Sequence, residues 1–264
     1  MTDVLSPQGI SEFLSEGLKD KIRVEFISET ESTNAIIKKR ASQGEKEGLF
    51  VVAGRQTEGR GRLGRSFFSP GDTGLYMSIL LRPCIKAENA VLITTAAAVS
   101  VCEALEKAGV KNPRIKWVND IFVEDKKVCG ILTEASFNPE KAELDYAVLG
   151  VGINVYEPEG GFPEDIKNIA GAVFSQKEEN LRNRIAGEFL NSFMAYYDSI
   201  SEKKHCAEYA KRNFVIGKKI NVIKNGTTTP AKALAIDTDC GLLVEYENGE
   251  SAILNSGEIS VRLQ

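Results

Sequence analysis

Apolar residues recur at helical spacing between residues 88 and 108, and this stretch predicts the clearest helix of the chain. Gly109 follows directly and supplies the stop, because glycine readily takes the left-handed conformation that ends many helices. A second apolar face recurs between residues 178 and 212 and predicts another largely helical region. Shorter helices are predicted over residues 6–18, with Ser6 as N-cap, and from Ser32-Thr33-Asn34 onward.

Short apolar or alternating runs between these helices predict β-strands. They cover residues 22–27, 49–53, 75–81, 115–117, 121–123, 128–134 and 144–154. Several of them are joined by tight turns, such as residues 124–127 and 138–140, rather than by helices. Runs of adjacent strands interrupted by few helices favour an α+β fold over a doubly wound α/β fold.

The pattern changes beyond Asn213, where the apolar runs become short and closely spaced. Strands are predicted at residues 219–223, 231–236, 242–246 and 251–254. The turns between them carry hairpin signals at Asn225-Gly226, residues 239–241 and Asn248-Gly249. We therefore expect two domains, a mixed α+β domain over residues 1–213 and a small all-β barrel over residues 214–264.

The 264-residue chain is 42% hydrophobic and 27% charged, which is typical of a globular protein, and its formal net charge is −4. A pI of about 5.4 argues against general nucleic-acid binding, which usually needs a basic face. Residues 1–20 lack the apolar core of a secretory signal. No apolar run approaches the roughly 18–20 residues of a membrane span, so we expect a cytoplasmic protein without a membrane partner.

Five cysteines are scattered without a Cys-x-x-Cys pair, a pattern that suits reduced thiols better than disulfides or a zinc site. His205, the single histidine, follows two lysines in a polar stretch, and we expect it on a helix surface. Without a second histidine or a paired thiol, the chain offers few candidates for triad-type nucleophilic catalysis.

The strongest chemical signal is the run Gly59-Arg60-Gly61-Arg62-Leu63-Gly64-Arg65, here called the basic loop. Glycine permits close backbone approach, so that N–H groups can converge on an anion. Arginine adds permanently charged forks that suit carboxylates and phosphates. The loop therefore predicts an anion-binding site. On its own it is equally compatible with a solvated basic loop or with an RNA-binding patch.

Five motifs that follow one another along the chain narrow this choice. They are Ser32-Thr33-Asn34; Gln56 with the basic loop; Lys116-Trp117-Val118-Asn119-Asp120; Lys127 with Gly130-Ile131-Leu132 and Glu134; and Gly150-Val151-Gly152-Ile153-Asn154. In this order and at this spacing they resemble the biotin protein ligases (biotin–[acetyl-CoA-carboxylase] ligases). The resemblance runs from about residue 22 to the C-terminus.

The resemblance implies a mixed-sheet catalytic domain of the biotin/lipoate ligase type, followed by a small C-terminal SH3-like β domain. So few residues precede the first predicted strand that the chain resembles the ligase-only type, without the DNA-binding winged helix of bifunctional members. DNA binding is therefore not expected, and a homodimer is compatible with the resemblance.

The family's reaction, as the resemblance implies it, has two steps. The carboxylate of biotin attacks the α-phosphate of ATP, which gives biotinyl-5′-AMP and pyrophosphate. A lysine on the biotin carboxyl carrier domain of a carboxylase then attacks this mixed anhydride and releases AMP. Because two anions must first meet, neutralisation by the basic loop and by nucleotide-bound Mg²⁺ would carry much of the catalysis.

The resemblance also assigns roles to individual residues. Catalytic roles fall to Arg62, Lys116, Asp120 and Lys127, with Asp120 orienting or deprotonating the attacking lysine. Biotin contacts are assigned to Ser32, Thr33, Asn34, Gln56, Gly59, Arg60, Gly61, Arg62, Lys127, Gly130, Gly150 and Gly152. ATP or adenylate contacts are assigned to Arg62, Arg65, Phe67, Asn119, Lys127 and Asn154, and no metal ligand is assigned.

Several of these residues also have plain structural interpretations. Ser32-Thr33 can serve as a helix N-cap, and Asp120 as a turn residue. Two positions depart from the family pattern. Val118 stands where proline is usual, and Phe67 stands where an aromatic residue, commonly tryptophan, covers the adenine. A lipoate–protein ligase, which shares the fold and the adenylation chemistry, is the main rival, but the basic loop and the C-terminal β domain favour a biotin enzyme.

Overall fold

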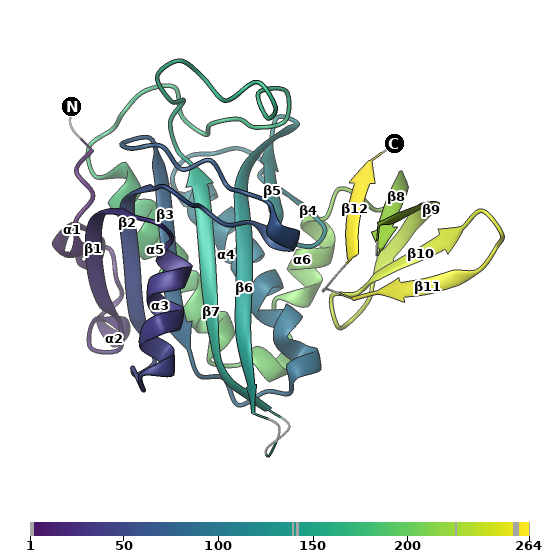
Figure 1. Ribbon diagram of the computed structural model, residues 1–264, viewed down its shortest axis with the longest axis horizontal. Helices are drawn as coiled ribbons and strands as arrows, with labels where there is room; N and C mark the ends of the chain where they lie inside the picture. The colour runs from purple at the N-terminus through teal and green to yellow at the C-terminus, as the bar shows by residue number, and fades with distance from the viewer. Residues whose placement is uncertain (1–2, 139, 141–142, 225, 256–258, 264) are drawn as a thin grey trace.

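The computed structural model describes residues 3–138, 140, 143–224, 226–255 and 259–263. Its larger part is built on a seven-stranded sheet with the strand order β1-β2-β3-β7-β6-β5-β4 (Figure 1). β1 (Arg23–Thr30) runs parallel to β2 (Leu49–Gln56), whereas every other pair of neighbours is antiparallel. The sheet is therefore mixed, and the expected α+β class is confirmed.

The other five strands all correspond to predicted ones. They are β3 (Gly74–Leu81), β4 (Arg114–Lys116), β5 (Asp120–Val123), β6 (Lys126–Asn138) and β7 (Glu143–Asn154). β6 was expected to end at Glu134, but its pairing with β7 continues to Asn138 past a bulge. Phe137 is half exposed there, so alternation of buried and exposed residues did not mark the extension. Pro139, in the predicted turn, lies outside the described residues.

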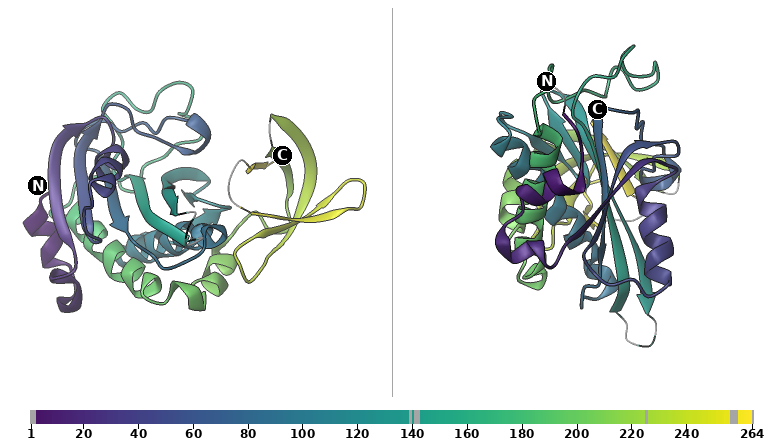
Figure 2. Two further views of the ribbon diagram at one scale, coloured as in Figure 1. Left: turned by 60° about the horizontal axis from the view of Figure 1, so that its bottom comes forward. Right: turned by 90° about the vertical axis from the view of Figure 1, so that its left-hand side faces the viewer.

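Helices cover both faces of the sheet, which Figure 2 shows edge-on. α4 (Val91–Lys107) and α5 (Leu181–Tyr197) lie on one face, and α3 (Thr33–Ser42) lies on the other. Ile37 of α3 packs in a separate apolar cluster with residues of β2, β3 and β7. Because β3 is covered from both sides, all eight of its residues are buried, which explains its continuous apolar run.

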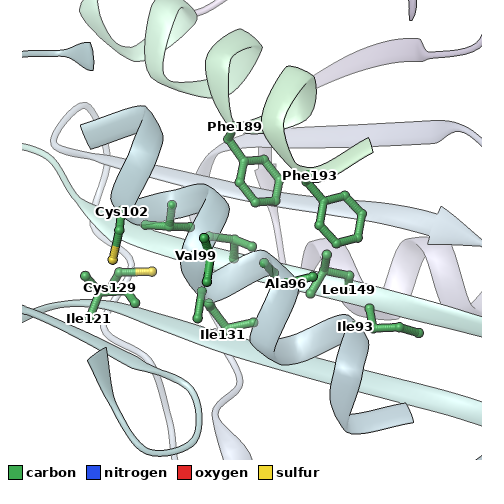
Figure 3. Close-up of a cluster of buried hydrophobic side chains, with 14 of the residues drawn as sticks. Ile93, Ala96, Val99, Cys102, Ile121, Cys129, Ile131, Leu149, Phe189 and Phe193 are labelled. Carbon is green, nitrogen blue, oxygen red and sulfur yellow. The ribbon is translucent and has the colours of Figure 1, made fainter. Parts of the chain in front are cut away.

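α4 forms the centre of the main core. Figure 3 shows its small and branched side chains next to aromatic residues of α5 and aliphatic residues of the sheet. Together with the short 3₁₀ segment η2 (Ala87–Ala90), α4 is long and apolar enough to cross a membrane, contrary to the expectation from the sequence. However, 78% of the most apolar window is buried inside the protein, as in the core helix of a globular domain.

Two predicted helices are divided in the structure. The N-terminal one splits into α1 (Pro7–Glu12), whose N-cap Ser6 accepts a hydrogen bond from the N–H of Gly9, and α2 (Glu16–Lys19). The second region divides into α5, the 3₁₀ segment η3 (Ile200–Glu202) and α6 (Cys206–Arg212). Lys203 ends η3 in a left-handed conformation, with φ 57°, so the helical path cannot continue.

The C-terminal part is a five-stranded antiparallel sheet with the order β11-β10-β9-β8-β12 (Figures 1 and 2). Its strands are β8 (Lys219–Lys224), β9 (Thr227–Ile236), β10 (Leu242–Tyr246), β11 (Ser251–Leu254) and β12 (Ile259–Leu263). β12 was not predicted. It pairs with β8, while β11 and β12 do not pair within the described residues, so the expected closed barrel is not seen. Asn225, in one predicted hairpin turn, lies outside the described residues.

The expectation of a surface position for His205 is wrong. Its side chain is fully buried between Thr95 of α4 and Cys240 in the turn before β10. The neighbouring sequence is polar, but the C-terminal domain packs onto this segment and removes the ring from water. The same packing brings Cys206 next to Cys240, although the sequence suggested scattered cysteines.

Candidate active site

A cavity of about 450 Å³, here called the charged chamber, lies beneath the basic loop. In Figure 1 the segment that carries this loop crosses in front of β7 and β6. The chamber brings together all four residues with a predicted catalytic role: Arg62, Lys116, Asp120 and Lys127. It also contains the residues expected to contact the nucleotide: Arg65, Phe67, Asn119 and Asn154.

The basic loop is a tight, internally hydrogen-bonded hairpin. The N–H of Gly61 donates to the carbonyl of Arg65 at 2.7 Å, and the N–H of Phe67 donates to the carbonyl of Gly59 at 2.8 Å. A Cβ on Gly59 would lie 2.2 Å from the carbonyl oxygen of Phe67, so glycine is required there. The hairpin directs Arg60, Arg62 and Arg65 to the chamber wall.

Lys127 and Asp120 form an ion pair across the β5–β6 hairpin, with 2.6 Å between Nζ and Oδ1. Both side chains are largely but not fully buried, at 29% and 21% exposure. The adjacent Lys126 points elsewhere and donates to the carbonyl of Asn168 at 2.9 Å. Of the two neighbouring lysines, it is therefore Lys127 that presents its charge to the chamber.

Arg62 lies in a more enclosed part of the chamber. Its Nη1 donates to Oδ1 of Asn119 at 3.2 Å, and the Asn119 amide in turn donates to the carbonyl of Ile131 at 2.8 Å. Burial lowers the pKa of the Arg62 guanidinium, while the negative charge of Asp120 raises it. Arg62 is still a cation, because guanidinium pKa values stay far above neutrality. The peptide bond that joins Trp117 to Val118, just before Asn119, is cis.

A second, much smaller cavity of about 30 Å³ adjoins the chamber and is here called the head-group pocket. Its polar lining comes from residues predicted to contact biotin: Ser32, Thr33, Asn34, Gln56 and Arg60. Oε1 of Gln56 accepts from the N–H of Thr33 at 2.8 Å, and Nε2 of Gln56 donates to Ser69. Ser32 occupies the N-cap position of α3, but its side chain makes no capping hydrogen bond. The simple N-cap interpretation of this residue therefore does not hold.

Ser78 is a buried polar residue that the sequence reasoning missed. It lies on β3, 1% exposed, with its Oγ 2.7 Å from Oγ1 of Thr33 and 2.6 Å from Oδ1 of Asn34. The Asn34 amide also donates to Glu134 at 3.0 Å. One signal was present, because a serine hydroxyl in a largely apolar, fully buried strand needs a polar neighbour.

Two of the predicted glycines face the ring of Phe67. A Cβ on Gly152 would lie 2.6 Å from this ring, and one on Gly130 would lie 3.2 Å from it. Gly150 has a different neighbour, since a Cβ there would lie 2.2 Å from Oδ1 of Asn34. Phe67 thus lies against the glycine face of the head-group pocket and separates this pocket from the chamber.

An apolar wall of the chamber was also missed. It is made by Phe162, Ile166, Ile169 and Ala170, which lie in the segment that connects β7 to α5. The wall is attached to β6, because the N–H of Lys127 donates to the carbonyl of Ile169 at 2.7 Å. Asn154 of β7 adds a hydrogen bond to the carbonyl of Gly171 at 3.1 Å. Apolar side chains in an otherwise polar loop were the available signal.

Comparisons with known proteins identify the family to which the chain belongs. Residues 25–154 match the Biotin/lipoate A/B protein ligase family, and residues 215–262 match the biotin protein ligase C terminal domain. A bifunctional ligase/repressor from Bacillus spizizenii is 33% identical over an alignment of 230 residues that covers 85% of this chain and 70% of that protein. The chain belongs to the biotin protein ligase family.

More distant members of the biotin protein ligase family cover nearly all of the chain. A biotin–[acetyl-CoA-carboxylase] ligase from Mycobacterium tuberculosis is 26% identical over 245 residues, 90% of this chain and 88% of that protein. The crystallised biotin protein ligase from Aquifex aeolicus, in complex with biotin and ATP, superposes with a TM-score of 0.73 at 26% identity. That alignment covers 92% of this chain and 99% of the Aquifex chain, so the likeness in fold extends over nearly the whole of both chains.

Proposed function

We propose that this protein activates biotin as biotinyl-5′-AMP and transfers it to a lysine of a biotin carboxyl carrier domain. The observation that carries the proposal is the position of Phe67, with a small hydrogen-bonding pocket on one side and a cationic chamber on the other. A molecule with a compact polar ring and an anionic tail fits this pair of cavities. Biotin has that form, since its ureido ring needs donors and acceptors and its valeryl chain ends in a carboxylate.

The head-group pocket would receive the ureido ring. Its Thr33, Asn34 and Gln56 side chains offer both donors and acceptors and are already held in place by hydrogen bonds. A volume of about 30 Å³ holds roughly two water molecules, which is less than a bicyclic ring needs. The Phe67 ring therefore has to leave the glycine face when biotin enters. In its new position the same ring can cover the adenine of the nucleotide.

The first step needs positive charge where the two anions meet. The biotin carboxylate would extend from the head-group pocket towards Arg62 and Lys127, and the α-phosphate of ATP would lie between these two cations. Arg60 and Arg65 add further charge from the basic loop. As pyrophosphate leaves, Lys127 and Arg62 would stabilise the negative charge that develops on the phosphoryl oxygens.

Mg²⁺ is expected to arrive with the nucleotide. Among the described residues of the chamber, Asp120 is the single carboxylate, and Lys127 pairs with it. This donor set is too small for an all-protein Mg²⁺ cage but fits an ion held chiefly by phosphates. When bound, the ion would neutralise phosphate charge beside Lys127.

The second step needs a neutral amine on the acceptor lysine. Asp120 is the carboxylate positioned to orient that amine and to accept its proton, once Lys127 has turned towards the phosphate. The lysine nitrogen then attacks the carbonyl carbon of the mixed anhydride, and AMP leaves. The carrier domain would approach from the chamber side, where the cavity reaches the protein surface.

A labelling experiment tests this proposal. The purified protein is incubated with ATP, Mg²⁺ and a carrier domain, together with either biotin or lipoate, and the mass of the carrier is measured. We expect the carrier to gain one biotinyl group and no lipoyl group. Transfer of lipoate alone would show that this member of the family is a lipoate ligase, and transfer of neither acid would refute ligase activity.

A further inference from the structure

The junction between the two domains holds a buried cluster that plays no part in the ligation chemistry. It consists of His205, Cys206 and Cys240, of which Cys206 is 6% exposed and the other two are fully buried. The two sulfur atoms lie 2.7 Å apart, and Nε2 of His205 lies 3.7 Å from Sγ of Cys206 and 3.9 Å from that of Cys240. The Nδ1 atom of His205 has no hydrogen-bond partner within the described part of the chain.

The two thiols belong to different domains. Cys206 begins α6 on the catalytic side, whereas Cys240 lies in the β9–β10 turn of the C-terminal sheet, in a left-handed conformation with φ 62°. Oδ1 of Asp237 shapes this turn by accepting the N–H groups of Asp239 and Gly241. An ion pair between Asp239 and Lys203 joins the turn to the catalytic side beside the thiols. The short sulfur–sulfur distance is thus maintained from both domains.

The surroundings shift the pKa values of the two thiols in opposite directions. The hydrogen bond from Cys240, supported by His205, lowers the pKa of Cys206 to about 5 despite its burial. The same hydrogen bond, together with burial, raises the pKa of Cys240. Cys206 is therefore the thiol that more readily becomes a nucleophilic thiolate, and Cys240 the one that more readily keeps its proton.

A bound metal ion explains the spacing of this cluster less well than a reaction between the two thiols does. Two thiolates on one tetrahedral zinc ion lie about 3.8 Å apart, given Zn–S bonds of about 2.3 Å. The observed spacing of 2.7 Å is much shorter. The described residues supply three donors here, whereas a structural zinc site needs four. The short spacing is closer to what formation of a sulfur–sulfur bond requires.

We propose that Cys206 and Cys240 are a redox-modification site, at which hydrogen peroxide creates a reversible disulfide between the two domains. The Cys206 thiolate attacks one peroxide oxygen, the O–O bond breaks, and the departing hydroxide takes up a proton to become water. Cys240 sulfur then attacks the sulfenic acid at Cys206, and the hydroxyl group leaves with the Cys240 proton as a second water. The two thiols lose two electrons in total, and the peroxide gains them.

The disulfide would act next to the active site. The indole Nε1 of Trp117 donates to the carbonyl of Cys240 at 3.1 Å, and Tyr209 of α6 donates to the carbonyl of Val118 at 2.9 Å. Trp117 and Val118 lead directly into Asn119 and Asp120. A bond between Cys206 and Cys240 would therefore fix the C-terminal domain against the segment that carries Asp120.

The test uses the full chain with equimolar to tenfold hydrogen peroxide, followed by alkylation of the remaining thiols, trypsin digestion and mass spectrometry. We expect peptide 205–211 joined to peptide 233–262, and separation of the two after dithiothreitol. The linked protein should also melt several degrees higher than the reduced form, because the bond constrains the unfolded chain.

Matched variants separate this reaction from ordinary surface oxidation. Cys84→Ser removes the exposed thiol and should leave the link and the rise in melting temperature intact. Cys206→Ser should abolish both, and if that variant does not fold, the peptide map of the unaltered protein is decisive alone. If peroxide oxidises Cys84 while Cys206 and Cys240 can both still be alkylated, the proposal is overturned. One equivalent of metal in the freshly purified protein, found by elemental analysis, would overturn it too.

Discussion

The head-group pocket and the charged chamber lie on either side of Phe67, yet they differ in almost every property. The pocket has a volume of about 30 Å³, and apart from Arg60, which it shares with the chamber, its polar side chains are neutral. Thr33, Asn34 and Gln56 are already hydrogen-bonded within the protein. The chamber has a volume of about 450 Å³ and is lined by five cationic side chains and one carboxylate. The cations are Arg60, Arg62, Arg65, Lys116 and Lys127.

This difference separates recognition from catalysis. A set of paired neutral groups costs little to bury and fixes the shape of the ring that it accepts. An excess of positive charge does not select a shape, but it lowers the energy of anions that would otherwise repel one another. We therefore expect changes in the pocket to alter affinity for biotin, and changes in the chamber to alter rates.

Lys127→Ala should have the largest effect. Removal of this charge from the chamber is expected to slow formation of biotinyl-AMP by about 10²–10³-fold, as for loss of other charge-stabilising groups. The measurement is pyrophosphate release with biotin and ATP in excess. Lys126→Ala is the matched control and should keep a nearly normal rate, because its side chain bonds to the carbonyl of Asn168 instead. Equal loss in both variants would contradict a specific role for Lys127.

Asp120→Asn should mainly impair the transfer step. An amide cannot accept the proton of the acceptor lysine, and a loss of about 10²-fold is expected for a missing general base. The rate is measured in a single turnover, from preformed biotinyl-AMP to the carrier domain. Asp125→Asn, which alters an exposed carboxylate of the same hairpin, should be nearly silent. A defect in adenylation with normal transfer would show instead that Asp120 serves to hold Lys127.

Gly152→Ala tests the steric limit of the pocket. The added Cβ would lie 2.6 Å from the present Phe67 ring and would occupy space that the biotin ring needs. We expect biotin to bind about ten- to a hundredfold more weakly, in line with the cost of one misplaced methyl group. Calorimetric titration measures this affinity. Gly71→Ala, with no atom within 4 Å of the new Cβ, is the control, and matching affinities in both variants would exclude steric control at Gly152.

Ser78→Ala should have the smallest effect, and it should lie in stability. The change removes one buried hydrogen-bond partner from Oγ1 of Thr33 and from Oδ1 of Asn34, which costs about 1–3 kcal/mol of unfolding free energy. Denaturant titration measures that loss. Ser42→Ala removes an exposed hydrogen bond and should change stability by less than about 0.5 kcal/mol. A neutral result at Ser78 would mean that water replaces its hydroxyl.

Much of the architecture could be predicted from local pattern. The α4 helix, all seven strands of the large sheet and four strands of the small one follow from periodicity and turn residues. The strand that was missed, β12, depends on its pairing with β8, which lies 35 residues earlier at the closest matched position, Ile259 with Lys224. Such a distant partner leaves no mark on the local sequence.

For the site, the sequence alone determined which residues carry charge and predicted which loop binds anions, because five spaced motifs are typical of one chemistry. It also favoured Lys127 over Lys126 for a catalytic role, and of the two lysines it is Lys127 that lines the chamber. Only the tertiary structure decided that Ser78 supports Thr33 and Asn34, that Phe67 lies against Gly152, and that His205 is buried beside Cys206 and Cys240. Periodicity reports the environment of one element, whereas these contacts arise from strand register and from packing between two domains.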